Sequence, residues 1–219
     1  MKNLTVYGIF LTLVIAAVGL ACQTQQPSAG ANNTSAVDHS AHDMSNMNGH
    51  DMSNMDHGMS APGAADQPYD LQFIDSMTHH HDGAVAMAEM VLRKTEREEL
   101  KKFAQKIIDD QKKEIAQMKA WREQWYAGKP SAMNMELPGM KMGEMSPDDS
   151  KMMETMQGKD FDLHFIDMMI PHHEGAVKMA RELLQKGEHA ELKNMANEII
   201  REQEAEIRQM QAWKAEWSK

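Results

Sequence analysis

The chemistry that this sequence offers is concentrated in two short stretches that combine methionine with paired histidines. Each stretch reads Met-x-x-His-His, and a further methionine follows about two helical turns after the pair. The residues are Met77, His80, His81 and Met87 in the first stretch, and Met169, His172, His173 and Met179 in the second. Thioether and imidazole groups together suit soft ions. The pattern therefore predicts binding of Cu(I), and by extension of Ag(I).

The composition is unusual in its methionine content. The chain has 23 methionines against 5 phenylalanines and 3 tyrosines, and its single cysteine is Cys22. One methionine at core spacing is more often packing than ligand, and one helical histidine is usually a surface or hydrogen-bonded core residue. The duplicated arrangement of both types favours the metal-binding interpretation. Thioethers also remain usable as ligands in an oxidising compartment, where thiols are lost to disulfides.

Further candidate ligands lie outside the two stretches. His79 adjoins the first pair, where the second stretch has Pro171. A polar segment near the N-terminus carries His39, His42, Met44, Met47, His50, Met52, Met55, His57 and Met59. The region between the stretches carries Met133, Met135, Met140, Met142, Met145, Met152, Met153 and Met156. Their open spacing predicts weak, exchangeable metal binding, and a polar tether of biased composition is the alternative.

An internal repeat must position the two stretches. The segment that begins at Tyr69 matches the segment that begins at Phe161 without a gap. About half of the paired positions are identical over a unit of roughly 60 residues, which indicates a duplication. The expected organisation is a helical hairpin at residues 67–126, a methionine-rich linker at 127–157 and a second hairpin at 158–219.

Both repeats are expected to be helical, because their apolar residues recur at helical spacing without strand-like alternation. On a helix, Met77, His80 and Met87 share one stripe, with His81 at its edge. A glycine recurs two residues after each histidine pair, where it would let a neighbouring helix or a ligand approach. A lone hairpin buries only one face, so the two hairpins should pair into an all-α four-helix bundle.

The ends of the expected helices are marked by particular residues. Asp70 and Asp162 are expected to cap the first helix of each hairpin at its N-terminus. Short breaks between the helices are expected at Thr95 and Gly187, and Gly187 is the stronger stop signal. The C-terminal half of the linker, from Gly143 onward, is compatible with a turn and a short helix.

The first 22 residues read as an export signal. Lys2 precedes an almost wholly apolar run from Leu4 to Leu20, and small residues then lead to Cys22. Such a segment is removed from the mature protein, and this one resembles a bacterial lipoprotein signal, in which the cysteine is lipidated. An uncleaved membrane anchor is the alternative. Both predict an extracytoplasmic protein in the bacterial periplasm or at the cell surface. Residues 23–66 are poor in large apolar side chains other than methionine, which predicts a disordered tail.

Other function classes find less support in the sequence. A net charge of −10 without a basic stripe argues against nucleic-acid binding. No nucleophile motif, phosphate loop or dinucleotide fingerprint is present, so we expect no enzyme. Gln111, Glu114, Gln203 and Glu206 could suggest a di-metal carboxylate site. For Glu114, however, an interhelical hydrogen bond or salt bridge is the favoured interpretation.

The stretches Phe73–Ala84 and Phe165–Ala176 resemble the signature of the CopM-like family. That family comprises bacterial exported proteins of ferritin-like helical-bundle form, long described as a domain of unknown function. Some members are periplasmic copper binders with methionine and histidine ligands. The resemblance covers about Gln67 to Lys219, and it implies the same fold and copper handling here.

The sequence thus predicts an extracytoplasmic copper-binding protein for metal sequestration, transfer or resistance. Its expected partners are the metal ion, a copper-transfer protein, and the membrane through lipidated Cys22; oligomer formation is left open. Two alternatives stay open as well. One is a ferritin-like di-metal carboxylate oxidase, and the other is a non-metal adaptor that binds a protein through its tryptophan-ended helices.

Overall fold

Each repeat folds into a pair of antiparallel helices in the computed structural model, which describes residues 59–219. The helices are α1 (Tyr69–Lys94), α2 (Glu98–Tyr126), α3 (Pro147–Thr155), α4 (Gly158–Lys186) and α5 (Ala190–Trp217). A 3₁₀ turn at Ala64–Asp66 precedes them, and this part of the chain contains no strand. The predicted all-α four-helix bundle is therefore confirmed, and α3 is the short helix that the linker was expected to allow.

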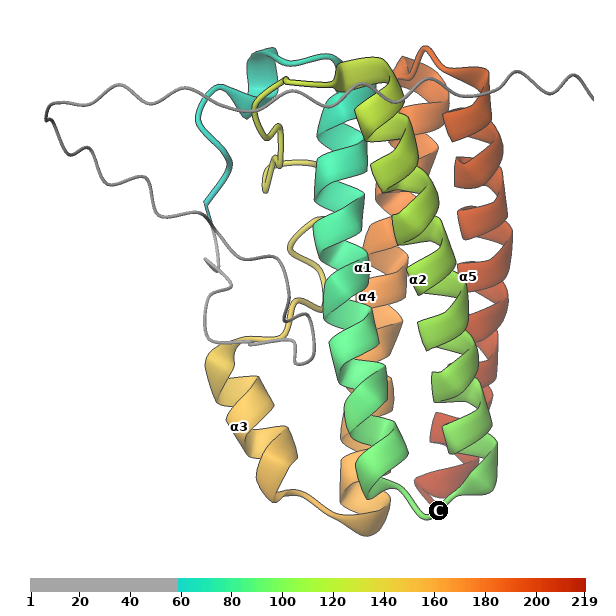
Figure 1. Ribbon diagram of the computed structural model, residues 1–219. Coiled ribbons are helices and arrows are strands. Elements are labelled where there is room, and N and C mark those ends of the chain that lie inside the picture. Colours follow the sequence, from blue (N-terminus) through green and yellow to red (C-terminus); the bar gives the residue numbers. More distant parts are fainter. Residues whose placement is uncertain (1–58) are drawn as a thin grey trace, which may run out of the picture. The chain divides into compact units, whose positions relative to one another are not determined.

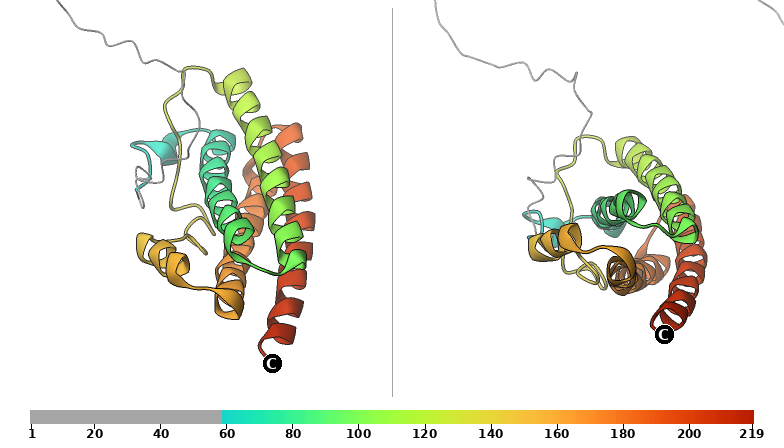
Figure 2. Two further views of the ribbon diagram at one scale, coloured as in Figure 1. Left: turned by 60° about the horizontal axis from the view of Figure 1, so that its bottom comes forward. Right: turned by 90° about the horizontal axis from the view of Figure 1, so that it is seen from below.

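The two hairpins meet through their first helices. α1 packs against α2, and α4 packs against α5. α1 and α4 contact each other and run in opposite directions (Figure 1). α3 lies on one side of this pair, and α2 and α5 lie on the other side (Figure 2). None of the helices in residues 59–219 is long and apolar enough to span a bilayer.

The core contains two clusters of buried apolar side chains. One includes Phe161 and Phe165, and the other includes Phe73 and Met118. Many of the buried positions carry methionine, whose flexible thioether fills irregular gaps between helices. Each cluster takes residues from both repeats, so the helical spacing that predicted the hairpins reflects apolar faces that pack across the bundle.

The linker is more ordered than its composition suggested. Met135 is 1% exposed, Met140 is 2% exposed, and Met153 on α3 is fully buried. The expectation of open, exchangeable binding is therefore wrong for these methionines, because they pack in the core. The expected disordered tail also extended too far: Ala61 donates its N–H to the carbonyl of Met133 at 2.8 Å, so the chain is ordered well before residue 66.

The expectation that Asp70 and Asp162 cap their own helices is wrong. The N-terminal residues of α1 and α4 follow Pro68 and Gln157, and neither aspartate bonds to them. Asp70 instead accepts the N–H groups of Glu188 and His189, and its Oδ2 lies 2.6 Å from Nδ1 of His189. Each aspartate thus points to the other repeat.

At the opposite end of the bundle, an arginine takes the place of His189 in the equivalent contact. Asp162 accepts a hydrogen bond from Nε of Arg97 at 3.0 Å. The Arg97 guanidinium lies 4.2 Å from the ring centre of Trp217, whereas at the first end the rings of His189 and Trp125 stack at 3.8 Å. Buried carboxylates therefore fasten the two hairpins at both ends.

The breaks between helices fall where the sequence predicted them, although Gly187 acts differently. Its φ is −70°, so it does not adopt the left-handed conformation of a usual glycine stop. A side-chain carbon there would lie 2.8 Å from Oδ1 of Asp70. Glycine is needed at this position because the carboxylate of Asp70 must approach the backbone.

Replacing Asp70 with alanine should destabilise the protein by about 2–3 kcal/mol, because several N–H groups lose a charged acceptor. Urea unfolding followed by circular dichroism would measure the change. Asp66→Ala removes an exposed aspartate nearby and should change the free energy of unfolding by less than about 0.5 kcal/mol. Equal effects of the two substitutions would contradict the role assigned to Asp70.

Candidate metal centre

His80 and His172 lie face to face where α1 crosses α4. Their ring centres are 3.7 Å apart, and the ring planes differ by 35°. Two glycines allow this approach: a side-chain carbon at Gly83 would lie 3.5 Å from Nε2 of His172, and one at Gly175 would lie 3.2 Å from Nε2 of His80. Each imidazole therefore rests over the glycine of the opposite repeat, as the recurrence of glycine in the motif predicted.

The two imidazoles are buried and lack hydrogen-bond partners. His80 is 4% exposed and His172 is 3% exposed. Within residues 59–219, neither nitrogen of His80 nor Nδ1 of His172 has a partner. A buried polar atom without a partner costs about 1–3 kcal/mol, and such atoms in a native structure call for an explanation, such as a bound ion.

Burial also keeps these rings uncharged. Desolvation lowers the pKa of His80 well below 6.5, and the neighbouring histidines, with His172 first among them, lower it further. Desolvation likewise lowers the pKa of His172, followed by the charges of His173 and His81. Both rings are therefore neutral near pH 7, which is the form of imidazole that binds a metal.

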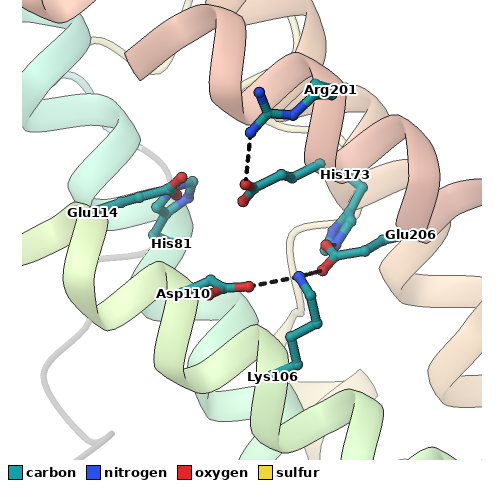
Figure 3. Close-up of polar contacts among 8 residues, drawn as sticks. His81, Lys106, Asp110, Glu114, His173, Arg201 and Glu206 are labelled. Carbon is teal, nitrogen blue, oxygen red and sulfur yellow. Dashed lines mark hydrogen bonds and ion pairs between the residues drawn. The ribbon is translucent and has the colours of Figure 1, made fainter. Parts of the chain in front are cut away.

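The second histidine of each pair faces a different environment. Nε2 of His81 lies 2.7 Å from Oε2 of Glu114, and Nε2 of His173 lies 2.9 Å from Oε2 of Glu206 (Figure 3). Each pair joins the two helices of one hairpin, and this confirms the interhelical bond expected for Glu114. The motif thus divides: one histidine of each pair joins the hairpins, and the other holds its own hairpin together.

The carboxylate of Glu206 responds to its neighbours. Burial alone would raise its pKa, but the hydrogen bond with His173 and the ammonium of Lys106 outweigh burial and lower the pKa. Glu206 is therefore ionised near pH 7. An ionised acceptor fixes the orientation of the His173 ring.

The four methionines of the motifs lie on both sides of the stacked imidazoles. All are fully buried. Met77 shares one core cluster with Met179, and Met87 shares the other with Met169. Met77 is about 4.5 Å along the helix axis from His80, whereas Met87 is about 10.5 Å away. The predicted stripe therefore exists, but only Met77 and Met169, each one turn from its histidine, are in reach of the imidazoles.

The linker closes one side of the imidazole pair. Gly139 and Gly143 have φ values of +98° and +66°, and side-chain carbons there would lie 2.3 Å from the carbonyl oxygen of Gly175 and 2.2 Å from the backbone nitrogen of His172. Cβ of Met142 lies against Gly175, on the side where Nε2 of His80 also approaches. Met142, one of the linker methionines that the sequence offered as ligands, therefore lies beside the pair, and its Sδ accepts a hydrogen bond from Nζ of Lys178 at 3.1 Å. The two flanking glycines are the signal that distinguishes it from the other linker methionines.

The remaining candidates are less concentrated. Nε2 of His79 lies 4.0 Å from Oε1 of Glu144, so His79 faces the linker. Met59 is 70% exposed, and the candidates from His39 to His57 lie outside the described residues. In the part of the chain that the structure describes, no three His, Cys, Asp or Glu side chains converge as a metal site. The helix crossing itself offers imidazole nitrogens with buried thioethers packed around them.

The fold and this site define a class of protein: a four-helix bundle built from a duplicated hairpin, with one Met/His motif on the inner helix of each repeat. The family model described as a domain of unknown function, DUF305, matches residues 70–214. The chain belongs to this DUF305 family, and the resemblance to its CopM-like members is confirmed by solved structures. A search of curated proteins found no match.

Two solved relatives are informative. CopM in its Cu(II)-bound form is 45% identical, with a TM-score of 0.58, over 68% of this chain and 97% of that chain. CopM has also been solved in Cu(I)-bound and Ag-bound forms, each 42% identical to this chain. A DUF305 protein from Streptomyces coelicolor, described as a candidate secreted protein, is 27% identical, with a TM-score of 0.63, over 69% of this chain and 94% of that chain.

Gly143→Ala should release the linker from the imidazole pair, because the new side chain would collide with the backbone of His172. Hydrogen exchange at residues 139–143 should accelerate by about tenfold or more. Gly128→Ala is the matched control, since Gly128 has a φ of +74° but nothing within 4 Å. Equal linker protection in the two variants would contradict the packing described here.

The metal-free protein should lose stability as the pH falls below 6.5. The folded protein holds the pKa of His80 and His172 below this value, so the unfolded chain takes up their protons first. Stability is complete above pH 6.5 and declines below it, by at most about 1.4 kcal/mol per pH unit for each histidine. Urea unfolding at several pH values would measure the slope, which should be shallower in a His80→Phe/His172→Phe variant.

Proposed function

We propose that this protein binds copper as Cu(I), and also Ag(I), outside the cytoplasm, for metal sequestration, transfer or resistance. The ligands are the imidazoles of His80 and His172 together with nearby thioethers. Met77 and Met169 lie one helical turn before His80 and His172, and Met142 lies beside the pair on the linker.

One observation carries the proposal: two neutral imidazoles are stacked in the protein interior with unpartnered nitrogens. A structural histidine in a core would normally have a hydrogen-bond partner. Here three of the four ring nitrogens, both of His80 and Nδ1 of His172, have no partner within residues 59–219, and methionines pack on both sides. An ion that bonds to the imidazole lone pairs would offset the cost of burying them.

The ligand types select the ion. Zn(II) favours thiolate, imidazole or carboxylate, and Ca(II) or Mg(II) requires oxygen ligands. The helix crossing offers imidazole and thioether, which favour Cu(I) and Ag(I). The copper- and silver-bound forms of the relative CopM support the same choice of ions.

The cellular setting is part of the proposal. We place the bundle in the periplasm or at the cell surface, anchored through lipidated Cys22, and a copper-transfer protein would exchange ions with it. Support comes from the apolar run that ends at Cys22 and from the secreted description of the Streptomyces coelicolor relative. The N-terminal histidines and methionines would raise the local metal concentration.

We propose no enzymatic activity. The oxidase alternative requires Glu114 and Glu206 to share one di-metal centre, but Oε2 of each carboxylate bonds to a histidine of its own hairpin. The adaptor alternative requires exposed tryptophans, whereas Trp217 is only 7% exposed and Trp125 stacks on His189. Neither alternative explains the unpartnered imidazoles at the helix crossing.

Competition with a calibrated chelator under reducing conditions would test the proposal. The N-terminal histidines and methionines are replaced by serine in every sample, so that only the bundle is measured. The parent should bind Cu(I) tightly, and His80→Phe/His172→Phe should weaken binding by more than about 100-fold, since loss of an outer-shell contact alone costs 10–100-fold.

Two substitutions serve as matched controls. His164→Phe removes a half-buried imidazole on α4 outside the crossing, and Met153→Leu removes a buried thioether on α3. Both should leave Cu(I) affinity unchanged, whereas Met77→Leu/Met169→Leu should lower it. Unchanged affinity after loss of both stacked histidines would refute the assigned site.

A further inference from the structure

A groove runs between α2 and α5, on the face of the bundle opposite the linker. It encloses about 380 Å³. Carboxylates dominate its lining, which includes Asp110, Glu114, Glu191, Glu198 and Glu202 against the single cation Lys113. Neither the Met/His site nor the contacts at the ends of the bundle uses this groove, so its concentrated negative charge needs another explanation.

A small cavity of about 10 Å³ lies at the base of the groove and shares Asp110, Glu114 and Glu202 with it. Its lining also includes Gln111 and Gln203, which occupy equivalent positions in the two repeats. They are 3% and 4% exposed, and the amide oxygen of each lacks a partner within residues 59–219. Two buried oxygen acceptors therefore line a space about the size of one water molecule or ion.

One half of this region already holds a cation. Nζ of Lys106 lies 2.6 Å from Asp110 and 2.9 Å from Glu206, so its ammonium bridges α2 and α5 (Figure 3). Burial alone would lower the pKa of Lys106, but the hydrogen bonds with the two carboxylates outweigh it and raise the pKa. This half of the groove therefore already contains a cation that the chain itself supplies.

The other half lacks this ammonium. The repeat places Glu198 at the position equivalent to Lys106, so a third carboxylate joins Glu114 and Glu202 there. Glu114 bonds to His81 through Oε2 and keeps Oε1 for another contact, and Glu202 pairs with the exposed Arg201. Glu198 has no ion-pair partner in residues 59–219. One half of the groove therefore contains the ammonium of Lys106, and the other half has Glu198 at the equivalent position.

We propose that the half of the groove formed by Glu114, Glu198 and Glu202 binds a hard divalent cation of the Ca²⁺ or Mn²⁺ class, with the amide oxygens of Gln111 and Gln203 as inner ligands. The ion takes the place that the Lys106 ammonium takes in the other half. All the ligands are oxygen atoms, which hard cations prefer.

The geometry sets the expected strength of binding. No three carboxylate or histidine side chains converge in the described part of the chain, so the glutamates must turn toward the ion. This rearrangement costs free energy, and a dissociation constant on the order of 0.1–1 mM, as in extracellular calcium modules, is expected. The bound ion would tie α2 to α5 and hence one hairpin to the other.

Titration of the full chain with Mn²⁺, followed by electron paramagnetic resonance, would test the site, and competition by Ca²⁺ would rank the two ions. Glu198→Lys should abolish this binding, because its ammonium would fill the half-site as Lys106 fills the other half. The same variant should unfold at a higher temperature without added cation. Glu198 is exposed, so the fold should tolerate the change.

Glu216→Lys is the matched control. It makes the same charge change on an exposed residue of α5, about 27 Å along the helix from Glu198, and should leave Mn²⁺ binding intact. Equal Mn²⁺ binding by wild type and Glu198→Lys would overturn the proposal, as would no binding by wild type up to about 10 mM, tenfold above the expected range.

The proposal is independent of copper binding, and the experiment can separate the two. His80→Phe/His172→Phe should lose Cu(I) affinity but keep Mn²⁺ affinity, since neither ring lines the groove. Lys106→Gln should add a second Mn²⁺ ion or tighten the first, because it empties the filled half. Loss of Mn²⁺ binding in the histidine variant would refute a separate site.

Discussion

The close crossing of α1 and α4 is the contact on which the rest of this structure depends. Gly83 and Gly175 have no side chain, so His80 and His172 can each lie over the opposite helix and stack. Both rings are buried at this crossing, and this burial lowers their pKa and keeps them neutral. Burial destabilises an isolated histidine, but here it leaves both imidazoles in the neutral form, which is the form that can bind a metal.

Duplication makes the two hairpins similar, and residues that differ between the repeats make different contacts at equivalent positions. Asp70 and Asp162 fasten the two ends of the bundle in the same way, but one meets His189 and the other meets Arg97. In the groove, the exchange of a lysine for Glu198 leaves carboxylates without their cation. The aspartate is thus common to both repeats, whereas its partner and the residue in the groove differ between them.

The linker is part of the bundle and of its site. Gly139 and Gly143 bring the backbone into contact with α4 at Gly175 and His172. The approach buries methionines that composition alone would assign to an open tether, and it covers the imidazole pair. An ion bound there as proposed would have to pass this packed segment.

The sequence by itself determined the helices, the duplication and the Met/His pattern, because helical periodicity and repeated residues are local properties. It also determined that Glu114 would bond across a hairpin, since short loops bring adjacent helices together. Only the tertiary structure decided that His80 meets His172 while His81 turns to Glu114, and that Asp70 binds the other repeat. Neighbouring side chains on a helix point about 100° apart, so their partners depend on how the hairpins pack, which the spacing of residues along one helix does not encode.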